Sequence, residues 1–215
     1  ALEVKLYPKR GGALCVIVIS VSAIICAALT VGAYLISLWA GVVIEAVLTC
    51  YILAARSLRD ESMKVYRALT DADIDTARYA LSMIVGRDTD RLNETGIIRA
   101  AVETVAENTS DGVIAPLIYT ALGGPVLGMV YKAINTMDSM IAYHNERYEI
   151  FGKAAAKIDD AAGFIPSRIS ALLMIVSAGI LRIFDKAYDP KRAYRIWRRD
   201  RRKHLSPNSA QTESA

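Results

Sequence analysis

A long stretch without charge constrains the fold of this chain more than any other feature of its sequence. Residues 11–44 contain no Asp, Glu, Lys or Arg, and the ten residues that follow Glu45 are also uncharged. A bilayer crossing takes roughly 20 apolar residues, so this stretch is long enough for two crossings. We expect transmembrane helices at about residues 12–31 and 37–56. A secretory signal fits less well, because its apolar core would be only about 7–15 residues long.

The composition also indicates a membrane protein. The 215 residues are 53% hydrophobic with a mean hydropathy of +0.29, which is more apolar than an ordinary soluble domain. The three cysteines lie in the two apolar segments without metal-ligand spacing, so neither a disulfide framework nor a zinc site is indicated. We expect an all-α, polytopic membrane protein in which residues 1–56 form two transmembrane helices and residues 57–215 include amphipathic cytoplasmic helices.

Two shorter uncharged segments lie in the second region. Residues 112–131 are long enough to cross a membrane, but Pro116, Pro125 and several glycines predict a broken helix. Residues 169–181 are better suited to a re-entrant or buried core helix, because the segment is short. We therefore expect membrane-embedded helices at about residues 112–131 and 166–182.

Basic residues predict the orientation in the membrane. They occur before the first apolar helix, after the second, and in the tail, where ten Lys or Arg lie in residues 182–203. The positive-inside rule places all three groups on the cytoplasmic side of the cell membrane. Either both later segments cross the bilayer or neither does, and we favour neither. The basic tail suits anionic lipid headgroups, whereas the absence of a binding module argues against nucleic acid.

Three carboxylates follow one another at helical spacing beside the third apolar segment. Glu103, Glu107 and Asp111 are four residues apart, which places them on one face of an α-helix. Because like charges repel, the arrangement favours a bound cation or a positively charged ligand. A solvated helix face is the alternative. The neighbouring apolar sequence and a second polar cluster, formed by Asn135, Asp138 and Ser139, favour a divalent metal site.

Further polar clusters lie at the margins of the apolar segments, where charged groups tend to mark function. They are the Gly-Arg-Asp-Thr turn at residues 86–89, Asn135 with Asp138 and Ser139, and Asp159 with Asp160. Pro166 is expected to start a helix with Arg168 in its first turn, where the helix dipole favours an anion. The alternative for Arg168 is an interfacial arginine paired with Asp159 or Asp160.

Seven motifs occur in a characteristic order between residues 56 and 208. They are Ile84 to Thr89, Glu103 to Asn108 with Asp111, Tyr131 to Met140, Tyr148 with Phe151, Asp159 with Asp160, Ile165 to Arg168, and His204 to Asn208. Their order and spacing closely resemble the adenosylcobinamide-phosphate synthase family, membrane proteins often called cobalamin biosynthesis protein B or D. The resemblance also implies that the chain is a fragment that lacks segments at both ends.

The resemblance implies an activity. The family joins a side-chain carboxylate of a corrinoid, adenosylcobyric acid, to the amine of aminopropanol phosphate or aminopropanol, and it uses ATP and Mg²⁺. Residues 57–215 would then form the catalytic region, on the cytoplasmic face of the membrane. Making an amide from a carboxylate requires activation, for example as an acyl phosphate, and the triphosphate requires a metal to shield its charge.

The resemblance covers the positions of the polar clusters, and the chemistry of their side chains suggests hypotheses for their roles. Glu103, Glu107 and Asp111 would bind Mg²⁺, and Asp159 and Asp160 would bind a second metal ion. Catalytic roles would fall to Glu103, Glu107 and Asp138. One of the carboxylates would act as the base toward the attacking amine. Binding of the nucleotide, the phosphate or the amine would fall to Arg87, Asn108, Lys132, Asn135, Thr136, Ser139 and Arg168. Arginine suits phosphate through two parallel hydrogen bonds.

Two other classes of function fit parts of the sequence. A non-enzymatic membrane sensor or regulatory protein would share the apolar helices. It would not need both the carboxylates of Glu103, Glu107 and Asp111 and the polar cluster of residues 135–139. A transporter would place polar residues inside the first two helices, where Glu45 is the only charged residue. The sequence does not define an oligomeric state.

Overall fold

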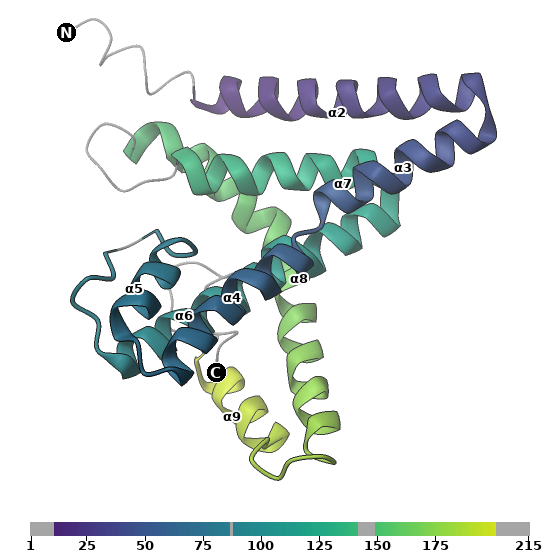
Figure 1. The fold of residues 1–215 in the computed structure, drawn as a ribbon. Helices are drawn as coiled ribbons and strands as arrows, with labels where there is room; N and C mark the ends of the chain where they lie inside the picture. Colours follow the sequence, from purple (N-terminus) through teal and green to yellow (C-terminus); the bar gives the residue numbers. More distant parts are fainter. Residues whose placement is uncertain (1–10, 87, 142–148, 201–215) are drawn as a thin grey trace, which may run out of the picture. The chain divides into compact units, whose positions relative to one another are not determined.

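The computed structural model describes residues 11–86, 88–141 and 149–200, and this part of the chain is helical without any strand (Figure 1). The prediction of an all-α fold is therefore confirmed. The elements are α2 (Gly11–Ile36), α3 (Leu38–Ile52), α4 (Ala55–Thr70), α5 (Ile74–Ser82), α6 (Glu94–Thr109), the π-helical η1 (Ser110–Ile114), α7 (Ala115–Ile141), α8 (Glu149–Leu181) and α9 (Pro190–Asp200). They belong to two compact units. The first unit is Ala1–Leu53 with Ile114–Pro166, and the second is Ala54–Val113 with Ser167–Ala215.

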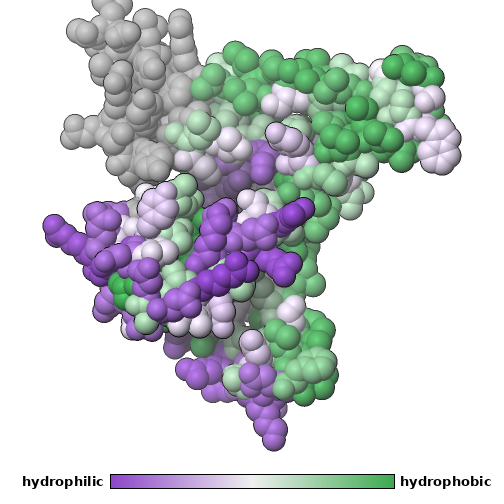
Figure 2. All heavy atoms as spheres, viewed as in Figure 1, coloured by the Kyte–Doolittle hydropathy of each residue, from purple (hydrophilic) through white to green (hydrophobic). Residues whose placement is uncertain are grey.

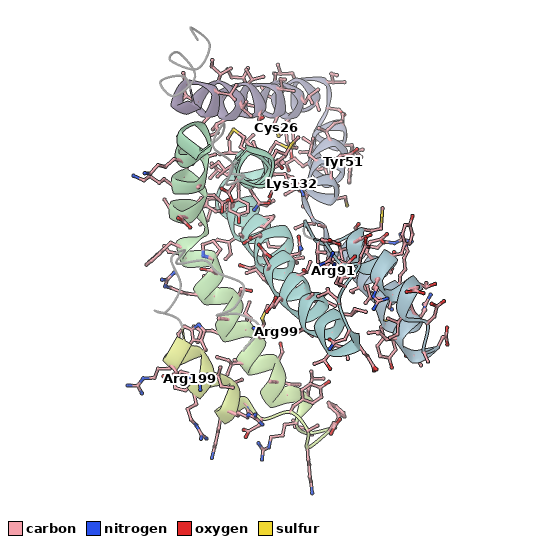
Figure 3. The ribbon with its side chains drawn as sticks, turned by 90° about the vertical axis from the view of Figure 1, so that its left-hand side faces the viewer. Cys26, Tyr51, Arg91, Arg99, Lys132 and Arg199 are labelled. Carbon is pink, nitrogen blue, oxygen red and sulfur yellow. The ribbon has the colours of Figure 1, made fainter. Side chains whose placement is uncertain are left out.

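The first unit contains α2, α3, α7 and the first half of α8. Helix α2 packs against both α3 and α7. Cys15, Met137 and Ala155 form a small buried cluster, and Cys26 is buried too (labelled in Figure 3). Many large apolar side chains of α2 and α3 are exposed, and Figure 2 shows the apolar surface that they form. Contact with lipid tails explains this exposure, because such surfaces are rare on soluble monomers.

Among the residues that the structure describes, four helices are long and apolar enough to cross a membrane. They are Gly12–Ile36, Leu38–Thr70, Glu94–Met140 and Gly152–Leu181. The first helix extends to Ile36 rather than to residue 31. Ser37 alone separates it from α3, and the Ser37 hydroxyl accepts a hydrogen bond from the Ala40 N–H at 3.0 Å. Helix α3 ends at Ile52, a few residues before the predicted end.

The second unit is built on α4, α5 and α6, which pack on one another. Small residues let these helices approach closely around a buried cluster made of Val65, Ala68, Ala77, Ala80, Leu81, Ile97 and Ala100. Side chains cap the N-termini of α5 and α6. Asp73 accepts from the Thr76 N–H at 3.0 Å, and Asn93 accepts from the Gly96 N–H at 2.8 Å. Helix α5 ends at Ser82, and the N–H groups of Ile84 and Val85 then donate to the Leu81 carbonyl.

The predicted break in the third apolar segment is confirmed. Helix α7 is interrupted at Gly123 (φ −152°, ψ 33°) and Gly124 (φ 64°, ψ −166°), directly before Pro125. The φ of Gly124 lies in the left-handed region that favours glycine. The expected start near residue 112 is wrong, however. The π-helical η1 joins α6 to α7, so the helix that carries the acidic residues continues into the apolar segment.

The expected helix start at Pro166 is also wrong, because α8 runs without interruption through this proline. A proline inside a helix has no N–H to donate to the carbonyl four residues earlier, which here belongs to Ala162. The Tyr119 hydroxyl donates to this Ala162 carbonyl at 3.0 Å. A side chain from α7 thus supplies the missing hydrogen bond, and the helix continues.

Candidate functional site

Glu103 and Glu107 lie on α6 in different surroundings. The Glu103 side chain is only 16% exposed, and the Arg99 Nε (labelled in Figure 3) donates to its Oε1 at 3.0 Å. Glu107 is exposed. A metal ion at Glu103 would have to compete with the Arg99 guanidinium, whereas the Glu107 carboxylate is accessible to solvent.

Asp111 is half-buried and belongs to η1. A π-helical turn contains more residues than an α-helical turn, so Asp111 does not keep the angular offset from Glu107 that the four-residue spacing predicts. Just before this turn, the Asn108 side-chain amide donates to the Thr104 carbonyl at 2.9 Å. The amide nitrogen of Asn108 is therefore used within its own helix, which leaves its side-chain oxygen for a ligand.

The second half of α7 carries the other predicted polar cluster. Lys132, Asn135 and Asp138 are half-buried, whereas Thr136 and Ser139 are exposed. The Ser139 hydroxyl donates to the Asn135 carbonyl at 3.0 Å, as hydroxyls often do inside helices. Lys132 and Asp138 are charged side chains partly withdrawn from solvent on a helix that is otherwise uncharged.

The structure brings together Asp138 and Asp160, a pairing that the sequence did not predict. Asp138 Oδ1 is buried and has no hydrogen-bond partner within the described residues. The carboxylate of Asp160, on α8, acts on Asp138 electrostatically. Its neighbour Asp159 is half-buried and acts on the hydroxyl of Tyr119 in the same way. The Asp160 carboxylate thus adds a negative charge near the buried Asp138 oxygen, and such an arrangement favours a cation.

Arg168 is half-buried within α8, two residues beyond Pro166. Because the helix does not begin at Pro166, the expected anion site at a helix N-terminus is absent at this place in the described chain. The guanidinium itself stays a candidate for phosphate, as the resemblance implies.

The structure describes only part of the Gly-Arg-Asp-Thr turn. Arg87 lies outside the described residues. Thr89 is buried, and its hydroxyl donates to the Arg78 carbonyl at 3.1 Å, while the Arg78 Nε donates to the Leu92 carbonyl at 2.9 Å. Thr89 and Arg78 therefore hold the loop in place, and sequence inspection had not singled out Arg78. The only local indication of this role in the sequence is that Arg78 is the single basic residue of the short helix α5.

The predicted site residues belong to both units. Glu103, Glu107, Asp111 and Arg168 lie in the second unit, and Asp138, Asp159 and Asp160 lie in the first. Within the described ranges, no group of three or more His, Cys, Asp or Glu side chains is arranged to hold one metal ion. A three-carboxylate cage is therefore not formed by this part of the chain. Mg²⁺ does not require one, because it binds one or two carboxylates together with waters and substrate phosphates.

A cavity of about 880 Å³ in the second unit is lined by residues of α4, α6, α8 and α9. Its walls are apolar apart from a few hydroxyl and ring N–H groups, and no charged residue lines it. ATP carries several negative charges and corrinoids carry many amides, so this cavity suits neither. The candidate chemistry therefore rests on the acidic residues.

The helices, their exposed apolar surfaces and their buried acidic groups define a polytopic helical membrane protein. The profile of the CobD/Cbib protein family matches residues 2–215, and the chain belongs to this family.

Curated relatives agree with this assignment. A protein of Geobacter metallireducens is 51% identical over 86% of this chain and 56% of its own length. A protein of Clostridium perfringens is 47% identical over 81% of this chain and 54% of its own length. Both are named cobalamin biosynthesis protein CobD. The chain thus spans about half the length of the curated relatives it matches. No solved structure matches it.

Proposed function

We propose that this chain is part of a cobalamin biosynthesis enzyme in the cell membrane, an ATP-dependent ligase whose active face is cytoplasmic. It would join the side-chain carboxylate of adenosylcobyric acid to the amine of aminopropanol phosphate or aminopropanol. Membership of the family and the names of its relatives support the pathway. The observation that carries the chemistry is the Asp138 and Asp160 pair, with its buried carboxylate oxygen.

The pair suits Mg²⁺. Hard cations prefer carboxylate oxygens, and Mg²⁺ is usually bound by one or two of them beside substrate phosphates. Asp138 Oδ1 has no other partner among the described residues, and a cation would relieve the repulsion from Asp160. Bound Mg²⁺ would neutralise part of the triphosphate charge. Asp138 and Asp160 would hold the ion, and Lys132, which lies on α7 with Asp138, is a candidate for the phosphate oxygens.

The reaction requires an activated acyl group. An oxygen of the corrinoid carboxylate would attack the γ-phosphorus of ATP, so that ADP leaves and an acyl phosphate forms. The amine nitrogen would then attack the acyl carbon, the C–N bond would form, and phosphate would leave. The proton lost by the nitrogen would pass to a protein base. Glu103 and Glu107 are the candidates for this base, and we favour Glu107 because it is the more exposed of the two.

The full-length gene provides the test. It is expressed in a cobalamin auxotroph that lacks the synthase, as wild type, as Asp138→Asn and as Asp60→Asn, an exposed carboxylate on α4 that serves as the control. We expect growth without added corrinoid intermediates for the wild type and for Asp60→Asn, and no such growth for Asp138→Asn. A wild-type transformant that grows only on added cobinamide would overturn the proposal and favour a regulatory protein or a transporter.

A further inference from the structure

Glu45 is the only charged residue in α2 and α3. It is half-buried near the middle of an apolar helix. A charged group in a membrane span is costly, and such residues usually have a partner and a function. The role of this carboxylate is not explained by the ligase chemistry described above.

Tyr34 holds one oxygen of Glu45. The Tyr34 hydroxyl, near the end of α2, donates to Glu45 Oε2 at 2.9 Å. The ring of Tyr34 lies against Gly41, where an added Cβ would overlap it. Gly41 thus makes room for the ring, and Glu45, one turn further along α3, receives its hydroxyl.

The other oxygen of Glu45 lies beside the break in α7. A Cβ placed on Gly124 would lie 3.9 Å from Glu45 Oε1. This is an ordinary contact distance, so a side chain at position 124 would have enough space. Glycine is favoured there because φ is positive. The second half of α7 begins at Pro125, and the dipole of a helix favours a negative charge near its N-terminal end.

We propose that Glu45 is a positioning residue. Its carboxylate, oriented by Tyr34, holds the start of the second half of α7, the segment that carries Lys132, Asn135 and Asp138. The break at Gly123 and Gly124 would otherwise let this half-helix turn relative to the first half. The effect on catalysis rests on the proposed function, whereas the effect on the geometry of α7 does not.

Two nitroxide labels across the break measure that geometry. Leu122 and Met140 are both strongly exposed, at 74% and 73%, and lie on opposite sides of the break. Each is replaced by cysteine in a Cys50→Ser background, since Cys50 is exposed. Pulsed electron spin resonance then gives the distribution of label distances in nanodiscs. Val47→Ala, an exposed residue on the same helix, is the matched control.

We expect Glu45→Ala to broaden or shift the distance distribution, Glu45→Gln to do so less, and Val47→Ala to match the wild type. A wild-type distribution in both Glu45 variants would overturn the proposal. Glu45→Gln keeps the size of the side chain, so its distance distribution tests the proposal even if the Glu45→Ala protein does not insert into the membrane.

Activity provides the second measurement. In the full-length enzyme, kcat should fall about 10- to 100-fold in Glu45→Ala, because misplacement by about an ångström has effects of that size, while the KM for ATP changes little. Broadened distances in Glu45→Ala together with an unchanged kcat would contradict the proposal that Glu45 positions the catalytic segment. If the wild-type protein has no ligase activity while Glu45→Ala still broadens the distances, the proposed function is refuted and the role of Glu45 in α7 geometry stands.

Discussion

Asp138 carries the most specific prediction at the scale of single residues. If Mg²⁺ binds at Asp138 and Asp160, saturating metal stabilises the folded protein; at 100 times the dissociation constant the gain is about 2.7 kcal/mol. We expect Mg²⁺ to raise the Tm of the wild type and not that of Asp138→Asn. In EDTA the variant should melt at the same temperature as the wild type or higher, because a repulsion is removed. Thermal melts with and without Mg²⁺ measure both effects, and an equal Mg²⁺ response in the variant would exclude Asp138 as a ligand.

Glu107 leads to a second prediction at this scale. Glu107→Gln keeps the shape of the side chain and removes a charge from an exposed position. We expect amide synthesis to fall by about 100-fold, in the range typical of general acid–base catalysis, with little change in Tm. Steady-state assays of the full-length enzyme measure the rate. Synthesis near the wild-type rate would show that the α6 carboxylates form a solvated surface.

At the scale of elements, Pro166 and Tyr119 form a pair that can be tested. Tyr119→Phe keeps the ring that stacks on Tyr131 and removes the hydrogen bond to Ala162. The unpaired carbonyl should cost about 1–3 kcal/mol. In a Pro166→Ala background the restored N–H can serve Ala162, so the same change should cost much less. Unfolding of the two single variants and the double variant measures this coupling, and additive effects would contradict the explanation of why α8 is continuous.

The cap of α5 predicts a dependence on pH. Hydrogen bonds from the Thr76 hydroxyl and backbone N–H lower the pKa of Asp73. A carboxyl with a folded pKa below its unfolded value stabilises the fold above the unfolded pKa, and this contribution is lost as pH falls through the folded value. Asp73→Ala should therefore be less stable than the wild type at pH 7, and the difference should close below about pH 4.

Denaturant unfolding of the wild type and Asp73→Ala across this pH range measures that difference. Asp90→Ala, an exposed carboxylate in the loop before α6, is the control and should show no such trend. A constant gap between wild type and Asp73→Ala at all pH values would mean that the charge of Asp73 does not contribute to the cap.

At the scale of the whole molecule, the distribution of basic residues predicts a topology that four membrane-length helices allow. Arg59 follows the first two helices and Lys186 follows α8, and both should lie on the cytoplasmic side. Single cysteines at these positions, in a cysteine-free background, should react with an impermeant maleimide only after the cells are permeabilised. Labelling of position 186 in intact cells would mean an odd number of crossings between the two sites.

The candidate site could be predicted from the sequence only in part. Glu103 and Glu107 share α6 as expected, because the spacing of residues four apart is a local property of a helix. The pairing of Asp138 with Asp160 could not be predicted, since it depends on how α7 packs beside α8.

The sequence by itself determined the all-α fold, the apolar helices and the break at Gly123 and Gly124. Each depends on residues within one or two turns, or on the length of an uncharged stretch, so local chemistry is sufficient. Only the tertiary structure decided that α8 continues through Pro166. The hydrogen bond that satisfies Ala162 comes from Tyr119, 43 residues away in the chain, and no local pattern encodes such a partner.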